Sequence, residues 1–341
     1  MRVTGSPARL DFISLGGTIA AMPSTSGGLA PSLDGRAILQ AIPGLQAFPG
    51  LRVVDGIRPR PGPHLDLTDV VELAHRARAL IAAGSKGIIV SQGTDTLEEV
   101  AFGVSLLAPR GVPIVFTGAM RDSTQAGADG PANVLGAVRV AASGLTSSMG
   151  VVVVINDEIH DAVDVQKTHT TNPAAFRSPN LGPVGWTAED RVEITSLPAN
   201  HPTADVGVDV VPGDVALLTM ALGSDGRLIR CVPQLGFEGL VVDGFGGGHV
   251  TPEAAQALIE VARDIPVLVA ARVRSGQMLH STYGFVGSER HLLAEGIIFA
   301  GMIGALKARI LLAVLVGNGA SRNEIERAFS YSDPRDERSE A

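Results

Sequence analysis

Cysteine, aromatic residues and clustered positive charge are all scarce in this chain. Its 341 residues contain one cysteine, Cys231, which excludes an internal disulfide and a cysteine-rich metal site. Aromatic residues make up 4% while glycine occurs 41 times, a balance that suits close-packed α/β units with many glycine-bearing turns. The net charge is −8 and no long basic run is present, which argues against a nucleic-acid partner, because neutralising phosphates needs clustered Lys and Arg.

Long apolar segments are scarce as well. The first nine residues are polar, contain Gly and Pro, and lack the apolar core of a signal peptide. The most apolar late segment, 296–316, is interrupted by Lys307 and Arg309, so it predicts a buried helix, or a strand plus a helix, rather than a membrane span. Together these features predict a soluble cytoplasmic protein that does not contact a membrane.

Apolar runs alternate with helix-like runs in both halves of the chain. This pattern predicts an α/β fold with two doubly wound, flavodoxin-like domains built on parallel sheets. The length also suits two domains better than one. We expect a larger N-terminal domain over 1–186, a polar linker over 187–213 and a smaller C-terminal domain over 214–341. The expected strands are 10–15, 51–55, 87–90, 113–117 and 150–155, then 215–220, 239–242 and 266–270; the expected helices are 34–41, 67–83, 97–102, 132–142, 252–263, 305–316 and 324–329.

The turn Ser91-Gln92-Gly93-Thr94-Asp95-Thr96 separates an expected strand from an expected helix. In an open parallel sheet such a turn lies at the carboxyl ends of the strands, where ligands bind. The N-terminus of the following helix adds backbone amides and a partial positive charge. Helix capping is the alternative interpretation, because Thr and Asp favour N-cap positions and a Glu a few residues later completes a capping box.

A second turn of this kind, Gly16-Gly17-Thr18, follows the first expected strand. Two glycines let the backbone turn sharply and approach a ligand, although the Thr18 hydroxyl can equally bond its own backbone. A threonine hydroxyl is a weak nucleophile unless a neighbouring group takes its proton, and Asp95 and Lys167 are candidates for that group. Backbone amides at Thr94 and Ala119 are candidates to stabilise an oxyanion, so the set predicts acyl transfer with hydrolysis.

The segment 156–175 is rich in acids, contains His160 and His169, and has no helical period. No pair in it has a recognisable metal-ligand spacing, so we prefer a solvated hairpin, with 163–167 as one arm, to a metal site.

Two segments, Leu15-Gly16-Gly17-Thr18-Ile19-Ala20 and Gln92-Gly93-Thr94-Asp95-Thr96-Leu97-Glu98-Glu99, resemble the two signature segments of the bacterial-type L-asparaginase (asparaginase/glutaminase) family. The resemblance continues in order through 117–121, 128–133, 164–168, 176–180 and 283–285, and so covers almost the whole chain. It implies a hydrolase of L-asparagine or a related small amide, active in asparagine catabolism without a cofactor or metal. It also implies a homotetramer of tight dimers, in which each smaller domain completes a neighbouring subunit's site.

Carried over residue by residue, the resemblance makes Thr18 the nucleophile that attacks the amide carbonyl. It makes Thr94, Asp95 and Lys167 a second triad, with Asp95 also binding the substrate amino group. The substrate-binding positions that it implies are Gly17, Gly93 and Ala119, together with Gly62 and Pro63, where the family carries a Ser-Gln pair that binds the substrate carboxylate.

The sequence departs from the family pattern around the substrate rather than at the four chemical groups. No tyrosine occurs over 27–29, where the family has one on a lid, and Gly62-Pro63 lack the family's side chains. No clear acidic residue from a neighbouring subunit is present over 278–283. An alternative is therefore a catalytically weak binding or regulatory protein on the same scaffold.

Two further alternatives have less support. A cofactor-free racemase needs two facing thiols, which a single cysteine excludes. A nucleotide site at Phe245-Gly246-Gly247-Gly248 lacks an acidic partner for the ribose at the expected distance.

Overall fold

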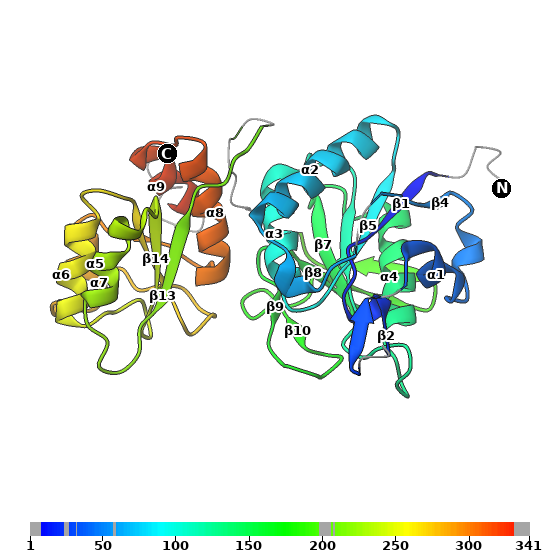
Figure 1. Cartoon of the computed structure of the whole chain (residues 1–341), viewed down its shortest axis with the longest axis horizontal. Helices are drawn as coiled ribbons and strands as arrows, with labels where there is room; N and C mark the ends of the chain where they lie inside the picture. The colour runs from blue at the N-terminus through cyan, green and yellow to red at the C-terminus, as the bar shows by residue number, and fades with distance from the viewer. Residues whose placement is uncertain are drawn as a thin grey trace. The chain divides into compact units, whose positions relative to one another are not determined.

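The computed structural model describes residues 8–23, 27–31, 33–56, 59–197, 206 and 209–330, and the chain forms two compact units, Met1–Pro198 and Ala199–Ala341. Each unit has a central sheet with helices on both of its faces (Figure 1). The predicted α/β class, with a larger N-terminal and a smaller C-terminal domain, is confirmed.

The N-terminal sheet has eight strands in the order β12-β11-β8-β7-β6-β5-β1-β4. The parallel strands are β1 (Leu10–Ser14), β4 (Leu51–Val53), β5 (Gly87–Ser91), β6 (Ile114–Thr117) and β7 (Val151–Ile155). Strands β1, β5, β6 and β7 are buried along their whole length, as expected of strands covered on both faces. All five correspond to predicted strands.

Three antiparallel strands extend this sheet, which is therefore mixed rather than wholly parallel. They are β8 (Glu158–Asp161), β11 (Gly185–Ala188) and β12 (Arg191–Ile194). The linker expected over 187–213 consequently began too early, since β12 lies inside that range. Strand β12 forms the edge of the sheet and its residues alternate between exposed and half-buried, which is why its sequence is polar enough to suggest a linker.

Helices α2 (Leu67–Ala82) and α3 (Leu97–Leu107) cover one face of the N-terminal sheet, and α1 (Gly35–Gln40) and α4 (Gly130–Ser143) cover the other (Figure 1). Helix α4 buries Val134, Ala137 and Val138 in the core that it shares with the central strands. The shorter elements are η1 (Thr18–Ala20), β2 (Ala21–Pro23), β3 (Leu29–Pro31), η2 (Leu45–Ala47), η3 (Gly62–His64), β9 (Gln166–Lys167) and β10 (Phe176–Arg177).

The strand order reverses between β1 and β5. From β1 the chain first adds β4 on one side, then returns to add β5, β6 and β7 on the other side. In open α/β sheets a ligand binds beyond the carboxyl ends of the strands at such a reversal. The turns that leave β1 and β5, which carry Thr18 and Thr94, are the two that flank it.

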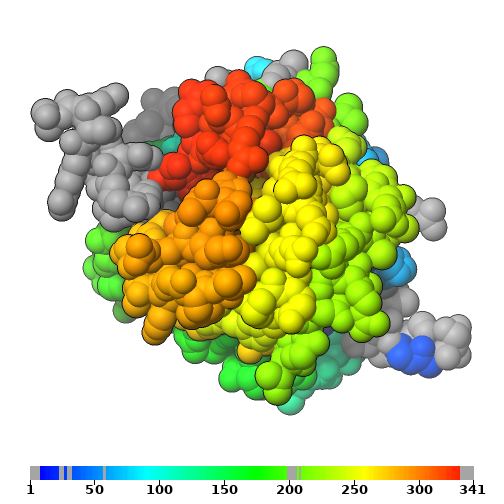
Figure 2. Space-filling view, turned by 90° about the vertical axis from the view of Figure 1, so that its left-hand side faces the viewer, coloured from blue at the N-terminus to red at the C-terminus, as the bar shows by residue number. Residues whose placement is uncertain are grey.

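The C-terminal unit has four parallel strands in sequence order: β13 (Val215–Thr219), β14 (Gly239–Gly244), β15 (Val267–Ala271) and β16 (Ile298–Phe299). Helix α8 (Ala305–Gly317) packs on one face of this sheet and is followed by α9 (Arg322–Ser330). The other face carries α5 (Arg227–Cys231), η4 (Pro233–Leu235), α6 (Pro252–Val261) and α7 (Glu289–Ala294) (Figure 1). Figure 2 shows the yellow surface of α6 next to the yellow-green surface of the segment that contains α5.

The apolar segment 296–316 forms β16 and α8, which matches the expected strand plus helix. Lys307 in α8 is buried. Within the described ranges, no helix has the length and apolar character that crossing a bilayer requires.

His160 on β8 leads to a prediction about stability at acid pH. Its side chain is fully buried, with Nδ1 3.0 Å from the Ser178 hydroxyl. Burial, and secondly the charge of Arg177, lowers the pKa of His160 from 6.5 to about 4. The unfolded chain therefore binds a proton at a higher pH than the folded chain does. We expect the free energy of unfolding to fall between pH 6.5 and 4, by at most about 3 kcal/mol from this group.

Urea unfolding over that pH range tests this expectation. His160→Gln should flatten the pH dependence, whereas His75→Gln, a change of an exposed histidine on α2, should leave it as in the parent protein. An identical slope for the parent and His160→Gln would contradict the assignment.

Candidate active site

Three glycines bring the turns after β1 and β5 and the loop before α2 into backbone contact. Gly17 has φ +86°, and a Cβ placed on it would lie 2.2 Å from both N and Cα of Gly93. A Cβ on Gly93 would in turn lie 3.0 Å from the Gly62 nitrogen. Only glycine fits at Gly17, both because φ is positive and because another backbone occupies the space of a side chain. The turns that carry Thr18 and Thr94 therefore touch each other.

The two threonines differ in their surroundings. Thr18 is the first residue of η1 and is half-buried, while Thr94 is buried. The N-cap of α3 is Thr96, and its hydroxyl makes no capping hydrogen bond; it donates instead to the Gly62 carbonyl at 3.1 Å. A threonine of this turn thus occupies the N-cap position, as the helix-capping interpretation expects, but its side chain does not cap the helix. Thr96 joins the turn to the Gly62 loop, and the Gln92 amide donates to its hydroxyl at 3.3 Å.

Lys167 reaches this turn from the β9–β10 hairpin. Its Nζ donates hydrogen bonds to Thr94 Oγ1 at 2.9 Å and to Asp95 Oδ1 at 2.7 Å. The Lys167 side chain is 16% exposed and that of Asp95 is 62% exposed. An ion pair with such an exposed carboxylate adds less than about 1 kcal/mol to stability, so its main consequence is to fix the ammonium beside Thr94. The structure thus joins the three residues of the expected second triad. Of the hairpin arm expected over 163–167, only Gln166–Lys167 form a strand, β9, and the expected solvated hairpin is wrong for 158–161, which form the mostly buried strand β8 of the main sheet.

The turn after β6 lies against Thr94. A Cβ on Gly118 would lie 2.8 Å from the Gln92 carbonyl oxygen and 3.1 Å from Thr94 Cγ2, so this turn contacts the Thr94 side chain. The next residue, Ala119, is buried. Asn133 on α4 donates to the Gly118 carbonyl at 2.9 Å, which holds the turn in place.

Asp129, just before α4, supports the same turn. Its carboxylate accepts the backbone N–H groups of Met120, at 3.0 Å, and Arg121, at 2.9 Å. Reasoning from the sequence gave neither Asp129 nor Asn133 a role. Their signals in the sequence are an Asp-Gly-Pro helix start, which many helices share, and their place in the family-like segment 128–133, which assigns neither of them a contact.

Gly62 and Pro63 lie at the first turn of η3 and offer few polar groups. The Gly62 carbonyl already accepts the Thr96 hydroxyl, and Pro63 is exposed and has no backbone N–H. Near the position where the family has its lid tyrosine, residues 24–26 lie outside the described part of the chain, and Gly27 and Gly28 are exposed.

The other polar candidates have structural partners. His169 Nδ1 accepts the N–H groups of Thr171 and Asn172 at 3.1 Å each, which closes the hairpin loop. Among the described residues, no group of three or more His, Cys, Asp or Glu could hold a metal ion. In the C-terminal unit, the Phe245 N–H bonds the His249 carbonyl at 2.8 Å, so the glycines between them form a tight turn before α6.

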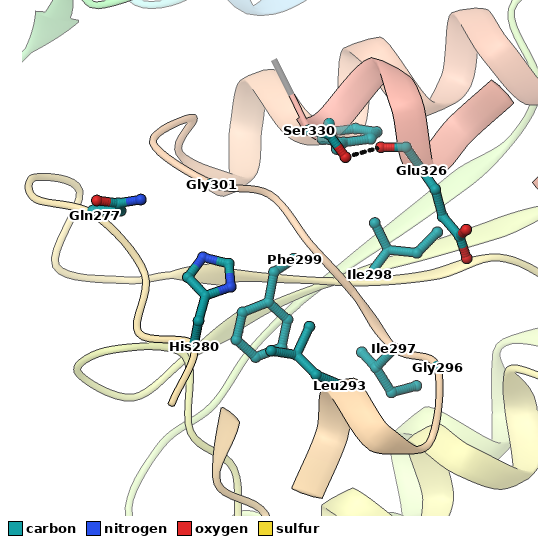
Figure 3. A pocket seen from close by; sticks show the side chains of 11 residues that line it. Gln277, His280, Leu293, Gly296, Ile297, Ile298, Phe299, Gly301, Glu326 and Ser330 are labelled. Atoms are coloured by element: carbon teal, nitrogen blue, oxygen red, sulfur yellow. Dashed lines mark hydrogen bonds between the residues drawn. The ribbon is translucent and has the colours of Figure 1, made fainter. Parts of the chain in front are cut away.

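A cavity of about 300 Å³ lies in the C-terminal unit between β16, α9 and the segment around Gln277 (Figure 3). Its lining combines apolar side chains, among them Phe299, with polar groups from residues such as Gln277 and His280. The Ser330 hydroxyl donates to the Glu326 carbonyl at 2.8 Å, and the Glu326 carboxylate pairs with Arg322 at 2.9 Å. No lining side chain combines a hydroxyl with a neighbouring base, so this cavity is not a candidate for the acyl-transfer chemistry.

Comparison with known proteins gives matches over both units. The family model described as Asparaginase, N-terminal, matches residues 9–200, and that of the Glutaminase/Asparaginase C-terminal domain matches residues 214–329. The chain is 36% identical over 327 residues to a probable L-asparaginase of Deinococcus radiodurans, covering 94% of this chain and 97% of that protein. It is 32% identical over 256 residues to L-asparaginase 2 of Escherichia coli K12 (72% and 70%). It is 31% identical over 272 residues to a glutaminase-asparaginase of Pseudomonas fluorescens biotype A (76% and 72%).

The contact between Gly17 and Gly93 can be tested by substitution. Gly84, after α2, has a similar φ of +93° but no atom within 4 Å of an added Cβ, which makes it a matched control. We expect Gly84→Ala to lower the free energy of unfolding by about 1 kcal/mol, from backbone strain alone. Gly17→Ala should cost at least about 2 kcal/mol more, because its Cβ overlaps Gly93. Equal losses in urea unfolding would show that the two turns do not touch.

Proposed function

The chain belongs to the asparaginase family and is an L-asparaginase-like amidohydrolase, and from this premise we propose that it hydrolyses L-asparagine, or a related small amide, through an acyl-threonine intermediate on Thr18. The products are aspartate, or the matching carboxylate, and ammonia. The observation that carries the proposal is the Lys167 ammonium on the Thr94 hydroxyl, in a turn that touches the Gly17-Thr18 turn.

In the first step Thr18 Oγ1 attacks the amide carbonyl carbon. The C–N bond breaks, and the proton from the Thr18 hydroxyl leaves with the nitrogen as ammonia. In the second step water adds to the acyl carbon, the ester bond to Thr18 breaks, and one water proton returns to Thr18 Oγ1. The overall reaction consumes one water and needs no redox partner.

Thr94 is suited to orienting the water or the carbonyl group. A hydroxyl has one donor and two acceptor positions. Because the Lys167 ammonium already donates to Thr94 Oγ1, the Thr94 hydrogen is directed away from Lys167 and remains for the substrate or the water. An ammonium has donors only, so in its charged form Lys167 polarises and orients Thr94 rather than removing its proton.

Asp95 supports the choice of an amino-acid amide. One of its oxygens, Oδ1, bonds Lys167, and most of the carboxylate remains exposed. An exposed carboxylate one residue from Thr94 is suited to bind the substrate ammonium by a charge-assisted hydrogen bond. Gly17, Gly93, Gly62, Pro63 and Ala119 would then contribute backbone surface around the substrate.

The remaining expectations stay predictions. We predict a homo-oligomer, a dimer or a tetramer, in which the C-terminal unit of a neighbouring copy completes each site. We also predict a cytoplasmic location, and a reaction that involves no cofactor, nucleic acid or membrane.

Ammonia release from a panel of L- and D-asparagine, L-glutamine and simple amides tests the proposal. Thr18→Ala should lower kcat on the best substrate at least about 1000-fold, because the nucleophile is lost. Lys167→Met should lower it at least about 100-fold, as expected for loss of a fixed positive charge that orients and polarises the Thr94 hydroxyl. Lys86→Met, a change of an exposed lysine beside β5, is the matched control and should keep the parent's rate.

Two results would contradict the proposal. The first is that Thr18→Ala and Lys167→Met both keep the parent's rate. The second is that calorimetry shows the parent binding asparagine or aspartate tightly while no amide in the panel releases ammonia, which would favour a binding or regulatory protein.

A further inference from the structure

We propose that Glu98 is a positioning residue that sets the place of Lys167 in the active site by holding its backbone. The inference rests on the proposed function, because it gives Glu98 a part in that reaction through Lys167. Glu98 holds Lys167, which contacts both Thr94 and Asp95, and it affects the reaction through Lys167.

The central observation is a hydrogen bond between two elements far apart in sequence. Glu98 is the second residue of α3, its side chain is buried, and its Oε2 accepts the backbone N–H of Lys167. Burying a carboxylate is costly unless it is hydrogen-bonded, and the N-terminus of a helix helps to stabilise its charge. The position of Glu98 therefore holds a buried carboxylate acceptor, although an apolar side chain would pack there with a smaller loss of free energy.

The hairpin needs such an anchor because the main sheet does not supply one. Among the described residues, β9 pairs only with β10, and each of the two strands contains two residues. The placement of so short a pair is weakly specified, and a slip by one residue turns every side chain to the opposite face. For Lys167 such a slip would point the ammonium away from Thr94.

Glu98 prevents such a slip, because the segment 94–98 then holds both the backbone and the ammonium of Lys167. The backbone N–H of Lys167 bonds Glu98, and its Nζ bonds Thr94 and Asp95, which precede Glu98 by four and three residues. The start of α3 is rigid, so it fixes the distance between the two attachment points. Glu98 thus fixes the position of the Lys167 ammonium, which the short hairpin alone would specify only weakly.

A helix-start role is the competing explanation, because acids in the first turn stabilise helices generally. Glu253 separates the two explanations. It is also the second residue of its helix, α6, but it is exposed. Removing its charge should reproduce any helix-start effect without changing Lys167.

The test compares Glu98→Ala, Glu98→Gln and Glu253→Ala in the full-length protein. In Glu98→Ala, kcat for the best amide should fall about 10- to 100-fold, as expected for a misplaced catalytic group, while KM changes less than about threefold. Glu98→Gln keeps an oxygen that accepts the Lys167 N–H, so its kcat should lie within about threefold of the parent. Glu253→Ala should keep the parent's kcat.

Hydrogen exchange of the Lys167 amide gives a second readout that does not depend on activity. The rate should rise at least about tenfold in Glu98→Ala, the change that corresponds to losing about 1.4 kcal/mol of protection, and should stay near the parent's in Glu98→Gln. If Glu98→Ala does not fold, Glu98→Gln decides: parent-like exchange and kcat support the inference, and rapid exchange or a large loss of kcat overturns it.

The inference is overturned if folded Glu98→Ala keeps kcat within twofold or leaves Lys167 exchange unchanged. It is also overturned if Glu98→Gln is as impaired as Glu98→Ala, because charge rather than the acceptor oxygen would then matter. These results differ from a failure of the proposed function, in which the parent itself would release no ammonia while the exchange data would still report whether Glu98 holds Lys167.

Discussion

The backbone contact between Gly17 and Gly93 is the constraint on which the rest of the candidate active site depends. It lies where the strand order reverses, between β1 and β5, and it leaves no room for a side chain on Gly17. Because the two turns touch, the residues that follow each glycine, Thr18 and Thr94, lie on turns in contact, which is why we propose that they act in one site. The parallel sheet determines which turns are neighbours, and glycine lets them approach closely enough to act on one small molecule.

The positive charge of the site is contributed from outside the sheet. Lys167 follows Thr94 by 73 residues and reaches it from a two-stranded hairpin that pairs with no strand of the main sheet among those described. The sheet therefore supplies hydroxyl and carboxylate groups on rigid turns, while the hairpin supplies the ammonium. In the reaction that we propose, the sheet fixes the positions of the nucleophile Thr18 and of Thr94, which orients the water. A few hydrogen bonds of the hairpin set the position of the Lys167 ammonium, which polarises Thr94.

The sequence predicts those parts of the fold that have a strong periodic signal. The central strands are continuous apolar runs, and helices such as α2 and α4 show helical spacing, so these elements agree with the structure. Strand β12 was missed because an exposed edge strand has alternating polar residues that resemble a linker. The short helices α5 and α7 contain too few residues to show a period.

The candidate site residues could likewise be predicted only where the sequence carries a local signal. Turns that carry Thr18, Thr94 and Asp95 could be predicted because each follows an obvious strand. Lys167 was one candidate to take a threonine proton, and only the family resemblance placed it in a triad with Thr94 and Asp95. Glu98 and Asn133 could not be predicted, because their roles depend on contacts with backbone groups distant in sequence, Lys167 N–H and the Gly118 carbonyl. An acid in the first turn of a helix looks the same in sequence whether it is exposed or reaches across to a hairpin.

A crystal structure of the protein with aspartate bound tests most directly whether Thr18 and Thr94 act on one small molecule. We expect a single carboxylate of aspartate within hydrogen-bonding distance of both the Thr18 and the Thr94 hydroxyls, with the Lys167 ammonium still on Thr94. Aspartate bound elsewhere, or a site in which only one of the two threonines faces the ligand, would contradict it.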